Sequence, residues 1–304
     1  NLKFAQPSMI QSKAVPLIMN EPHQNVIVMA PNGSGKTGAF SIGSTARVDP
    51  TIDEMQIVVL TNSRELCNQV ANVYELLTKG TTITVQNFAH AKKKAHIVVT
   101  TPGAFLQMIG QRGAPTTKKL RCVVMDEADE FMKDDKSFGD ILKIKKKLEG
   151  INFQWILFSA TFKKEYLDNQ VYQLMEKAQI IKLESKKIAE KLQHIKQYHL
   201  KCEPRKKLEF IMDVFETCAM TQTFIFVNTK DFAEVIHKKL RKNGLSSYIM
   251  FGRMTKEERD DTMQKFRDQQ INVLITTNII ARGIDVPQVE LVINYDVPTQ
   301  KVNN

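Results

Sequence analysis

The feature that most constrains the fold is a regular alternation of short apolar runs with longer segments of helical length. Runs rich in Val and Ile are typical of buried strands, and they lie at residues 25–30, 57–60, 96–100, 121–125, 154–158 and 180–183. Helix-length segments separate them, among them residues 64–78, 137–148 and 163–175. Strands that are apolar throughout and alternate with helices predict an α/β fold with a parallel sheet covered on both faces.

The alternation is interrupted once and then restarts. A lysine-rich polar stretch near residues 184–190 lacks strand character, and new strand-like runs follow at residues 195–200, 223–227, 247–250, 272–276 and 291–294. A chain of 304 residues has room for two domains. We therefore predict two α/β domains, residues 1–184 and 192–304, joined by a short linker at residues 185–191.

Composition narrows the class of protein. No apolar stretch approaches the roughly 20 residues needed to cross a bilayer, so no membrane insertion is expected. The four cysteines are widely spaced without a C-x-x-C pair, which predicts reduced thiols rather than a metal cluster. The net charge of +10 favours a polyanionic partner such as nucleic acid, although basic proteins without one are common.

A glycine-rich loop follows the first strand-like run. Residues 30–37 read Ala-Pro-Asn-Gly-Ser-Gly-Lys-Thr, and a helix-compatible segment comes next. Glycines let successive backbone N–H groups converge on phosphate oxygens, while the lysine reaches the outer phosphates and the threonine hydroxyl helps to hold Mg²⁺. The residues expected to bind the nucleotide here are Gly33, Ser34, Gly35, Lys36 and Thr37.

An acidic tetrapeptide, Asp126-Glu127-Ala128-Asp129, follows another predicted strand. Ligands of open parallel sheets bind beyond the carboxyl ends of the strands, so these carboxylates are expected near the phosphate loop. We assign Asp126 to Mg²⁺ and Glu127 to orienting or deprotonating the attacking water. Both Thr37 and Asp126 are therefore candidate metal ligands.

Together these motifs resemble the DEAD-box RNA helicases of superfamily 2, and the resemblance covers essentially the whole chain. Residues 4–11 resemble the adenine-reading segment of that family, with Gln11 as the glutamine. Residues 61–66 and 101–103 resemble its RNA-backbone segments, and residues 159–161 resemble the segment that links hydrolysis to strand separation. Residues 226–229 and 276–285 resemble the motifs of the second domain.

The resemblance implies two RecA-like domains and an RNA-stimulated ATP hydrolase, with ATP and Mg²⁺ as cofactors. It implies catalytic roles for Lys36, Asp126, Glu127, Ser159 and Thr161. It adds Gly283 and Asp285 to the nucleotide site, and it assigns RNA binding to Arg64, Thr101, Gly103 and Thr277.

Within the family, Asn32, Ser63 and residues 275–285 most resemble the helicase of mRNA export at the nuclear pore. The translation-initiation helicase is the alternative within the family. The export resemblance implies RNA of low sequence specificity as a partner, a nucleoporin and an inositol-phosphate-dependent activator. It also implies a monomer in the cytoplasm and nucleus, at the nuclear pore.

Two departures from the family pattern affect the expected function. The paired glycines expected between residues 64 and 101 are absent, which predicts fewer RNA contacts. The arginine-rich segment that stabilises the transferring phosphoryl group is also absent, so we expect the second domain to be incomplete and residues 1–304 alone to hydrolyse ATP poorly. This absence keeps a second hypothesis open, namely an ATP-gated RNA clamp or assembly platform with little turnover.

Overall fold

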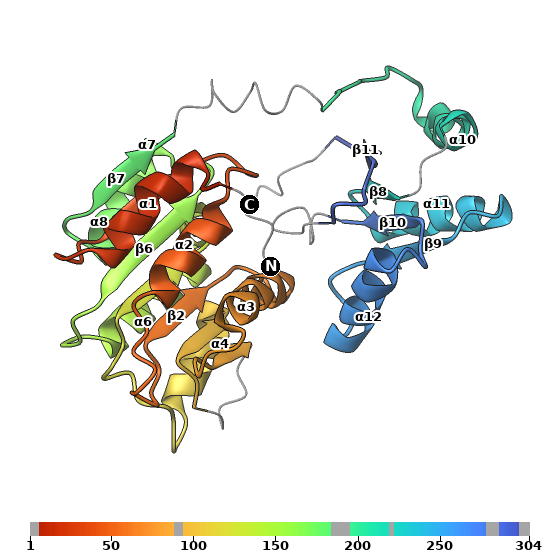
Figure 1. The fold of residues 1–304 in the computed structure, drawn as a ribbon. Coiled ribbons are helices and arrows are strands. Elements are labelled where there is room, and N and C mark those ends of the chain that lie inside the picture. The colour runs from red at the N-terminus through yellow and green to blue at the C-terminus, as the bar shows by residue number, and fades with distance from the viewer. Residues whose placement is uncertain (1–5, 88–93, 184–194, 219–221, 278–285, 298–304) are drawn as a thin grey trace. The chain divides into compact units, whose positions relative to one another are not determined.

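The computed structural model describes residues 6–87, 94–183, 195–218, 222–277 and 286–297, and the chain divides into two compact units (Figure 1). Unit 1 comprises Asn1–Lys196 and unit 2 comprises Gln197–Asn304. The predicted linker, residues 185–191, lies outside the described residues, so the exact domain boundaries remain a prediction. No helix in the described part of the chain is both long and apolar enough to cross a membrane.

Unit 1 is built on a seven-stranded sheet with the order β3-β4-β2-β5-β6-β1-β7, in which every pairing is parallel. Its strands are β1 (Val26–Met29), β2 (Ile57–Leu60), β3 (Val85–Asn87), β4 (Ile97–Thr100), β5 (Cys122–Met125), β6 (Gln154–Ser159) and β7 (Gln179–Lys182). The strands β2, β4, β5 and β6 are buried along their whole length, as expected of a sheet covered on both faces.

Helices cover both faces of this sheet (Figure 1). The helices of unit 1 are α1 (Met9–Met19), α2 (Lys36–Thr45), α3 (Arg64–Thr78), α4 (Pro102–Gly110), α5 (Ala128–Met132), α6 (Asp135–Lys147), α7 (Lys164–Tyr166), the π-helical segment η1 (Leu167–Val171) and α8 (Tyr172–Leu174). Side chains of α1, α2 and α3 pack on one face, and those of α4, α5, α6 and α8 pack on the other.

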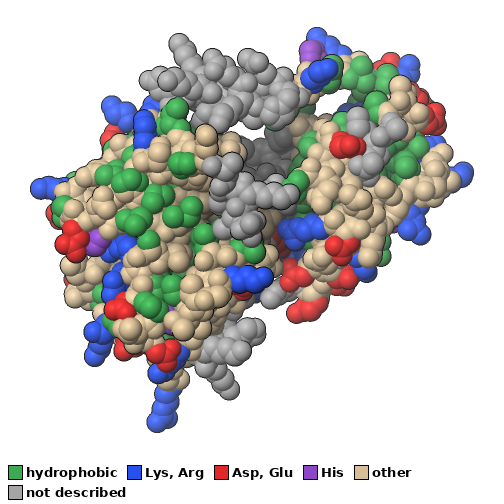
Figure 2. Space-filling view, in the orientation of Figure 1, with side chains coloured by type: hydrophobic (Ala, Val, Ile, Leu, Met, Phe, Trp, Pro, Cys, Tyr) green, Lys and Arg blue, Asp and Glu red, His purple; other side chains and the backbone are tan. Residues whose placement is uncertain are grey.

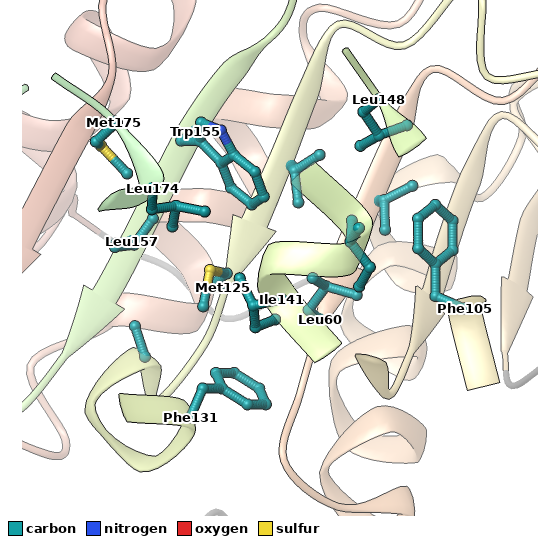
Figure 3. Packing of buried hydrophobic residues seen from close by; sticks show 14 of the residues in the cluster. Leu60, Phe105, Met125, Phe131, Ile141, Leu148, Trp155, Leu157, Leu174 and Met175 are labelled. Atoms are coloured by element: carbon teal, nitrogen blue, oxygen red, sulfur yellow. The ribbon is translucent and has the colours of Figure 1, made fainter. Parts of the chain in front are cut away.

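The second of these faces holds the larger cluster of buried side chains, shown in Figure 3. Trp155 and Leu157 point from β6 into it, and Phe131 reaches it from α5. Ile141 brings α6 onto the same cluster. This packing places α5, which contains Asp129, against β6 and α6.

Unit 2 has a four-stranded parallel sheet with the order β11-β8-β10-β9. Its strands are β8 (Thr223–Phe226), β9 (Ser247–Met250), β10 (Val273–Thr276) and β11 (Leu291–Asn294), and its helices are η3 (Pro204–Lys206), α10 (Lys207–Thr217), α11 (Lys230–Lys242) and α12 (Lys256–Arg267). Side chains of α10 and α11 pack on one face and those of α12 on the other. The predicted fold class, two parallel α/β sheets, is confirmed.

Two local predictions differ from the structure. The strand predicted at residues 195–200 is wrong, because these residues form no strand and are all exposed, with Tyr198 86% exposed. Their apolar residues do not alternate strictly, so no face of such a strand would be apolar. The helix predicted at residues 163–175 is divided into α7, η1 and α8.

Candidate functional site: a nucleotide and RNA edge of the first sheet

The phosphate loop joins the end of β1 to the start of α2, as predicted. Gly33 and Gly35 have positive φ angles of 73° and 95°, a conformation that glycine adopts at little cost. Lys36 is the first residue of α2 and is 93% buried, since its relative exposure is 7%. Its ammonium donates hydrogen bonds to the carbonyl oxygen of Ala30 and to Oδ1 of Asn32, each at 2.9 Å.

Gln11 connects the predicted adenine segment to this loop. Its Oε1 accepts from the backbone N–H of Ser8 at 2.8 Å, and its Nε2 donates to the carbonyl oxygen of Gly35 at 3.3 Å. The Ser8 hydroxyl in turn caps the first turn of α1. The two segments that the resemblance assigns to adenine and to phosphate therefore touch.

Asp126 and Glu127 follow β5 directly. Asp126 is 4% exposed and accepts a hydrogen bond at 3.0 Å from the backbone N–H of Glu127. The pKa of Asp126 is raised to about 7, chiefly by burial and also by the neighbouring Glu127, while Lys36 opposes the shift. Glu127 itself has a positive φ of 51°, which is rare outside glycine and is typical of functional sites.

The residues present suit a magnesium–nucleotide complex. Mg²⁺ is commonly held by one or two protein oxygens, with waters and phosphates completing its coordination, and Thr37 and Asp126 provide such oxygens. A cation would relieve the burial of two adjacent carboxylates. The Ser34 hydroxyl in the loop is buried without a hydrogen-bond partner among the described residues, so a donor is present for a phosphate oxygen.

Asp129 joins the acidic tetrapeptide to the end of β6. Its carboxylate is 1% exposed and accepts hydrogen bonds from Ser159 Oγ and, at 3.3 Å, from Thr161 Oγ1. The carbonyl oxygen of Ser159 accepts from the N–H of Ala30 at 3.0 Å. Ser159 thus bonds to both predicted ATP motifs.

The residues predicted to bind RNA in unit 1 follow two other strands. Arg64 begins α3 after β2, and the preceding Ser63 caps that helix through a 3.1 Å bond from the N–H of Leu66. Thr101 precedes α4 after β4, and Gly103 lies in its first turn. β2 and β4 are neighbours in the sheet, so these residues lie at adjacent strand ends.

The strand order divides the carboxyl edge of the first sheet into two halves. β1, β6 and β5 carry the phosphate loop, Ser159 and Asp126, and these strands are consecutive in the sheet. β2 and β4 come next and carry Arg64 and Thr101. The predicted nucleotide residues and the predicted RNA residues therefore lie side by side, with the boundary between β5 and β2.

Unit 2 presents a second such edge. Thr277 follows β10, and Asn228 follows the neighbouring β8. The backbone N–H of Asn228 donates to Asp296 Oδ2 at 3.0 Å, which joins the ends of β8 and β11. Gly283 and Asp285, the other nucleotide residues predicted for this domain, lie outside the described residues.

Sequence reasoning missed two side chains in the first site. Asn32 bonds to Lys36, and Lys133 lies 3.3 Å from Asp129 Oδ2. The i,i+4 spacing of Asp129, in α5, and Lys133, directly after α5, could have indicated that pair. Nothing in the local sequence indicates the Asn32 contact, which depends on how the loop folds.

The basic side chains do not gather on the face drawn in Figure 2, where Lys and Arg are spread among Asp and Glu. Lys143 and Lys145 bond to Asp140 Oδ1 and to the carbonyl oxygen of Gln173, respectively. The lysines at residues 143–147 therefore lie on the exposed face of α6.

Comparison with known proteins decides the family. A model of the DEAD/DEAH box helicase family matches residues 8–169, more than half of the chain, and a model of the helicase conserved C-terminal domain matches residues 206–304. The chain belongs to the DEAD/DEAH box helicase family. The resemblance seen in the motifs is thereby confirmed.

Relatives of this DEAD/DEAH box helicase chain point to one branch of the family. The ATP-dependent RNA helicase DBP5 of Scheffersomyces stipitis is 36% identical over 313 residues, which cover 100% of this chain and 61% of that protein. The chain thus spans about three-fifths of the length of that curated relative.

Solved structures agree. S. cerevisiae Dbp5 bound to RNA and ADP BeF3 has a TM-score of 0.88 at 33% identity, with 98% of this chain and 77% of that chain covered. A variant of the same helicase bound to Nup159, Gle1, IP6 and ADP has a TM-score of 0.69 at 32% identity, with 98% and 78% covered.

Proposed function

We propose that this chain is the core of an ATP-dependent RNA helicase, which binds RNA and couples ATP hydrolysis to local duplex separation and RNA–protein remodelling. The observation that supports the proposal is the divided carboxyl edge of the first sheet, with the predicted nucleotide residues at the ends of β1, β6 and β5 and the predicted RNA residues after β2 and β4. One rigid sheet edge can then bind both ligands and transmit the state of one to the other.

In this proposal the phosphate loop binds the triphosphate. Phosphate oxygens accept hydrogen bonds from the backbone N–H groups of Gly33, Ser34 and Gly35 and from those at the start of α2. Lys36 contacts the β- and γ-phosphates. Gln11, already bonded to Gly35, reads the adenine edge. Mg²⁺, held by Thr37 and Asp126, would supply neutralising charge on the phosphates.

Glu127 positions the water that attacks the γ-phosphate and accepts its proton. The side chain is 7% exposed and sits on a backbone of positive φ next to Asp126. Ser159 and Thr161, through Asp129, convey the nucleotide state to the rest of the molecule. Gly283 and Asp285 are proposed to complete the site.

RNA is proposed to be held mainly at its sugar–phosphate backbone by Arg64, Thr101, Gly103 and Thr277, which gives little sequence preference. The similarity to DBP5 helicases supports a role in mRNA export, at the nuclear pore between nucleus and cytoplasm. The related Dbp5 structure with Nup159, Gle1 and IP6 supports a nucleoporin and an inositol-phosphate-dependent activator as partners.

The test is ATP hydrolysis by the protein, with and without single-stranded RNA. We expect RNA-stimulated turnover that Glu127→Gln reduces by at least about 100-fold, the usual contribution of a general base. Glu149→Gln, at an exposed glutamate after α6, serves as the matched control and should keep full activity.

Each other result has a defined meaning. ATP-dependent RNA binding without turnover would replace the helicase by an ATP-gated RNA clamp. Turnover that does not respond to RNA would contradict RNA as the substrate.

A further inference from the structure

Lys133 forms an ion pair with the buried carboxylate of Asp129. Asp129 lies in α5 and is 1% exposed, with Ser159 Oγ bonded to Oδ1 and Thr161 Oγ1 bonded to Oδ2. Two hydroxyls, one from the last residue of β6 and one from the segment that follows it, therefore share one carboxylate from a different element.

Lys133 follows α5 directly and brings a cation to the same group. Its Nζ lies 3.3 Å from Asp129 Oδ2, the oxygen that Thr161 also contacts. Lys133 is 35% exposed and forms a second ion pair with Glu130. The ammonium of Lys133 is thus partly exposed to solvent, whereas the Asp129 carboxylate with which it pairs is buried.

The energetics make this pair unlike a surface ion pair. Exposed ion pairs contribute little to stability, whereas removing one partner of a buried pair leaves a charge that the interior does not compensate. A carboxylate deprived of its cation must draw in water or move toward solvent. Either movement shifts the oxygens to which Ser159 and Thr161 bond.

Those bonds are connected to the nucleotide site through the backbone. The carbonyl oxygen of Ser159 accepts from the N–H of Ala30 at the start of the phosphate loop, and Asp129 lies three residues after Asp126. A displacement of the Asp129 carboxylate would therefore shift both the backbone near Ala30 and the segment that contains Asp126.

We propose that Lys133 is a positioning residue: it holds the Asp129 carboxylate as the shared acceptor of Ser159 and Thr161, and so sets how strongly ATP and RNA binding affect each other. This inference rests on the proposed function. Lys133 touches neither substrate in this account and acts only through Asp129.

The first experiment needs neither ATP nor RNA. A double-mutant cycle combines Lys133→Met with Ser159→Ala in the full chain. Urea unfolding is followed by the fluorescence of Trp155, which is the single tryptophan and lies in unit 1. We expect the two effects on the unfolding equilibrium constant to be non-additive by about threefold or more, as for residues that share a partner.

The matched control replaces Lys143, whose ammonium pairs with Asp140 at 2.8 Å while it is 68% exposed. Lys143→Met removes an ion pair of similar length from a surface helix. Its effect should add to that of Ser159→Ala.

The second experiment measures the ratio of RNA Kd values without and with a non-hydrolysable ATP analogue. In Lys133→Met this ratio should fall by about fivefold or more, because coupling between two sites is commonly 5–150-fold. Lys133→Arg, which keeps the cation, should restore most of the ratio, and Lys143→Met should leave it unchanged. A purely stabilising role would lower the folded fraction without changing the ratio.

The outcomes separate the two proposals. An additive cycle, or an unchanged ratio in Lys133→Met, overturns the role of Lys133 even where the unaltered protein shows coupling. A protein of natural sequence whose RNA affinity ignores the ATP analogue overturns the proposed function and this inference together.

Discussion

The ammonium of Lys36 donates a hydrogen bond to the side-chain oxygen of Asn32, 2.9 Å away, within the loop that we expect to bind phosphate. Lys36 also donates to the carbonyl oxygen of Ala30. The side chain of Asn32 is therefore positioned to compete with a nucleotide phosphate for the same cation.

We expect Asn32→Ala to lower the Kd for ATP by about two- to tenfold, the equivalent of one net hydrogen bond. Asn32→Asp should raise the Kd, because a charged acceptor binds the ammonium more strongly. Titration with a fluorescent ATP analogue measures both. Equal Kd values for the three proteins would show that the contact does not oppose binding.

Gly35 should tolerate substitution less well than Gly33. Both have a positive φ, but a Cβ at Gly35 would meet Ser8 Oγ at 2.8 Å and Gln11 Nε2 at 2.9 Å, whereas one at Gly33 meets nothing within 4 Å. Gly33→Ala should cost about 1–2 kcal/mol for the left-handed backbone alone. Gly35→Ala should cost more and also raise the Kd for ATP, because Gln11 is displaced. Urea unfolding and nucleotide titration compare the two, and equal losses would contradict the prediction.

Gly43 in α2 packs against Ile18 of α1, and a Cβ there would lie 3.0 Å from both Cβ and Cγ2 of Ile18. Gly43→Ala should destabilise the protein by about 1–3 kcal/mol, the usual cost of overpacking. Gly139→Ala in α6 is the control, since its Cβ meets nothing within 4 Å. It should stabilise by about 0.5–1 kcal/mol through helix propensity. Two shifts of the same sign in urea unfolding would refute the packing argument.

Asp126 should make stability depend on pH. Its pKa is raised by burial from 3.8 in the unfolded chain to about 7, so between these values the folded state keeps a proton that the unfolded state has lost. The contribution of Asp126 to the free energy of unfolding is therefore fully present below pH of about 4 and is lost as the pH rises through about 7. Asp126→Asn removes this slope.

The measurement is urea unfolding of both proteins from pH 5 to 8 without nucleotide. We expect the natural protein to lose stability relative to Asp126→Asn as the pH rises. A constant difference would mean that Asp126 titrates alike in both states.

Much of the sheet was predictable because buried parallel strands carry a strong local signal. β2, β9 and β11 match the predicted residues, and the remaining predicted strands that form differ by one residue at either end. β3 was missed because Val85-Gln86-Asn87 is short and largely polar. The false strand at residues 195–200 shows the converse, since apolar residues without a pairing partner form no strand.

The site was predictable only in part. The order of motifs indicated Lys36, Asp126 and Glu127, because their chemistry follows from local sequence and from their place after strands. The order of motifs does not predict which distant segments touch, and the hydrogen bond from Gln11 to Gly35 is an example. They depend on which strands become neighbours, and only the folded sheet determines that.

The position of β1 in the sheet has a consequence for synthesis on the ribosome. β1 is the first of the described strands, and among them it pairs with β6 and β7, whose residues Ile156 and Gln179 are paired with Val26. At about 5–20 residues per second, the nascent chain carries β1 without its neighbours for on the order of ten seconds. During that interval the apolar Val26–Met29 segment has no strand partner, and chaperones or transient non-native contacts must cover it and the attached phosphate loop. Mutations that slow the pairing of β6 should therefore first reduce the yield of soluble protein.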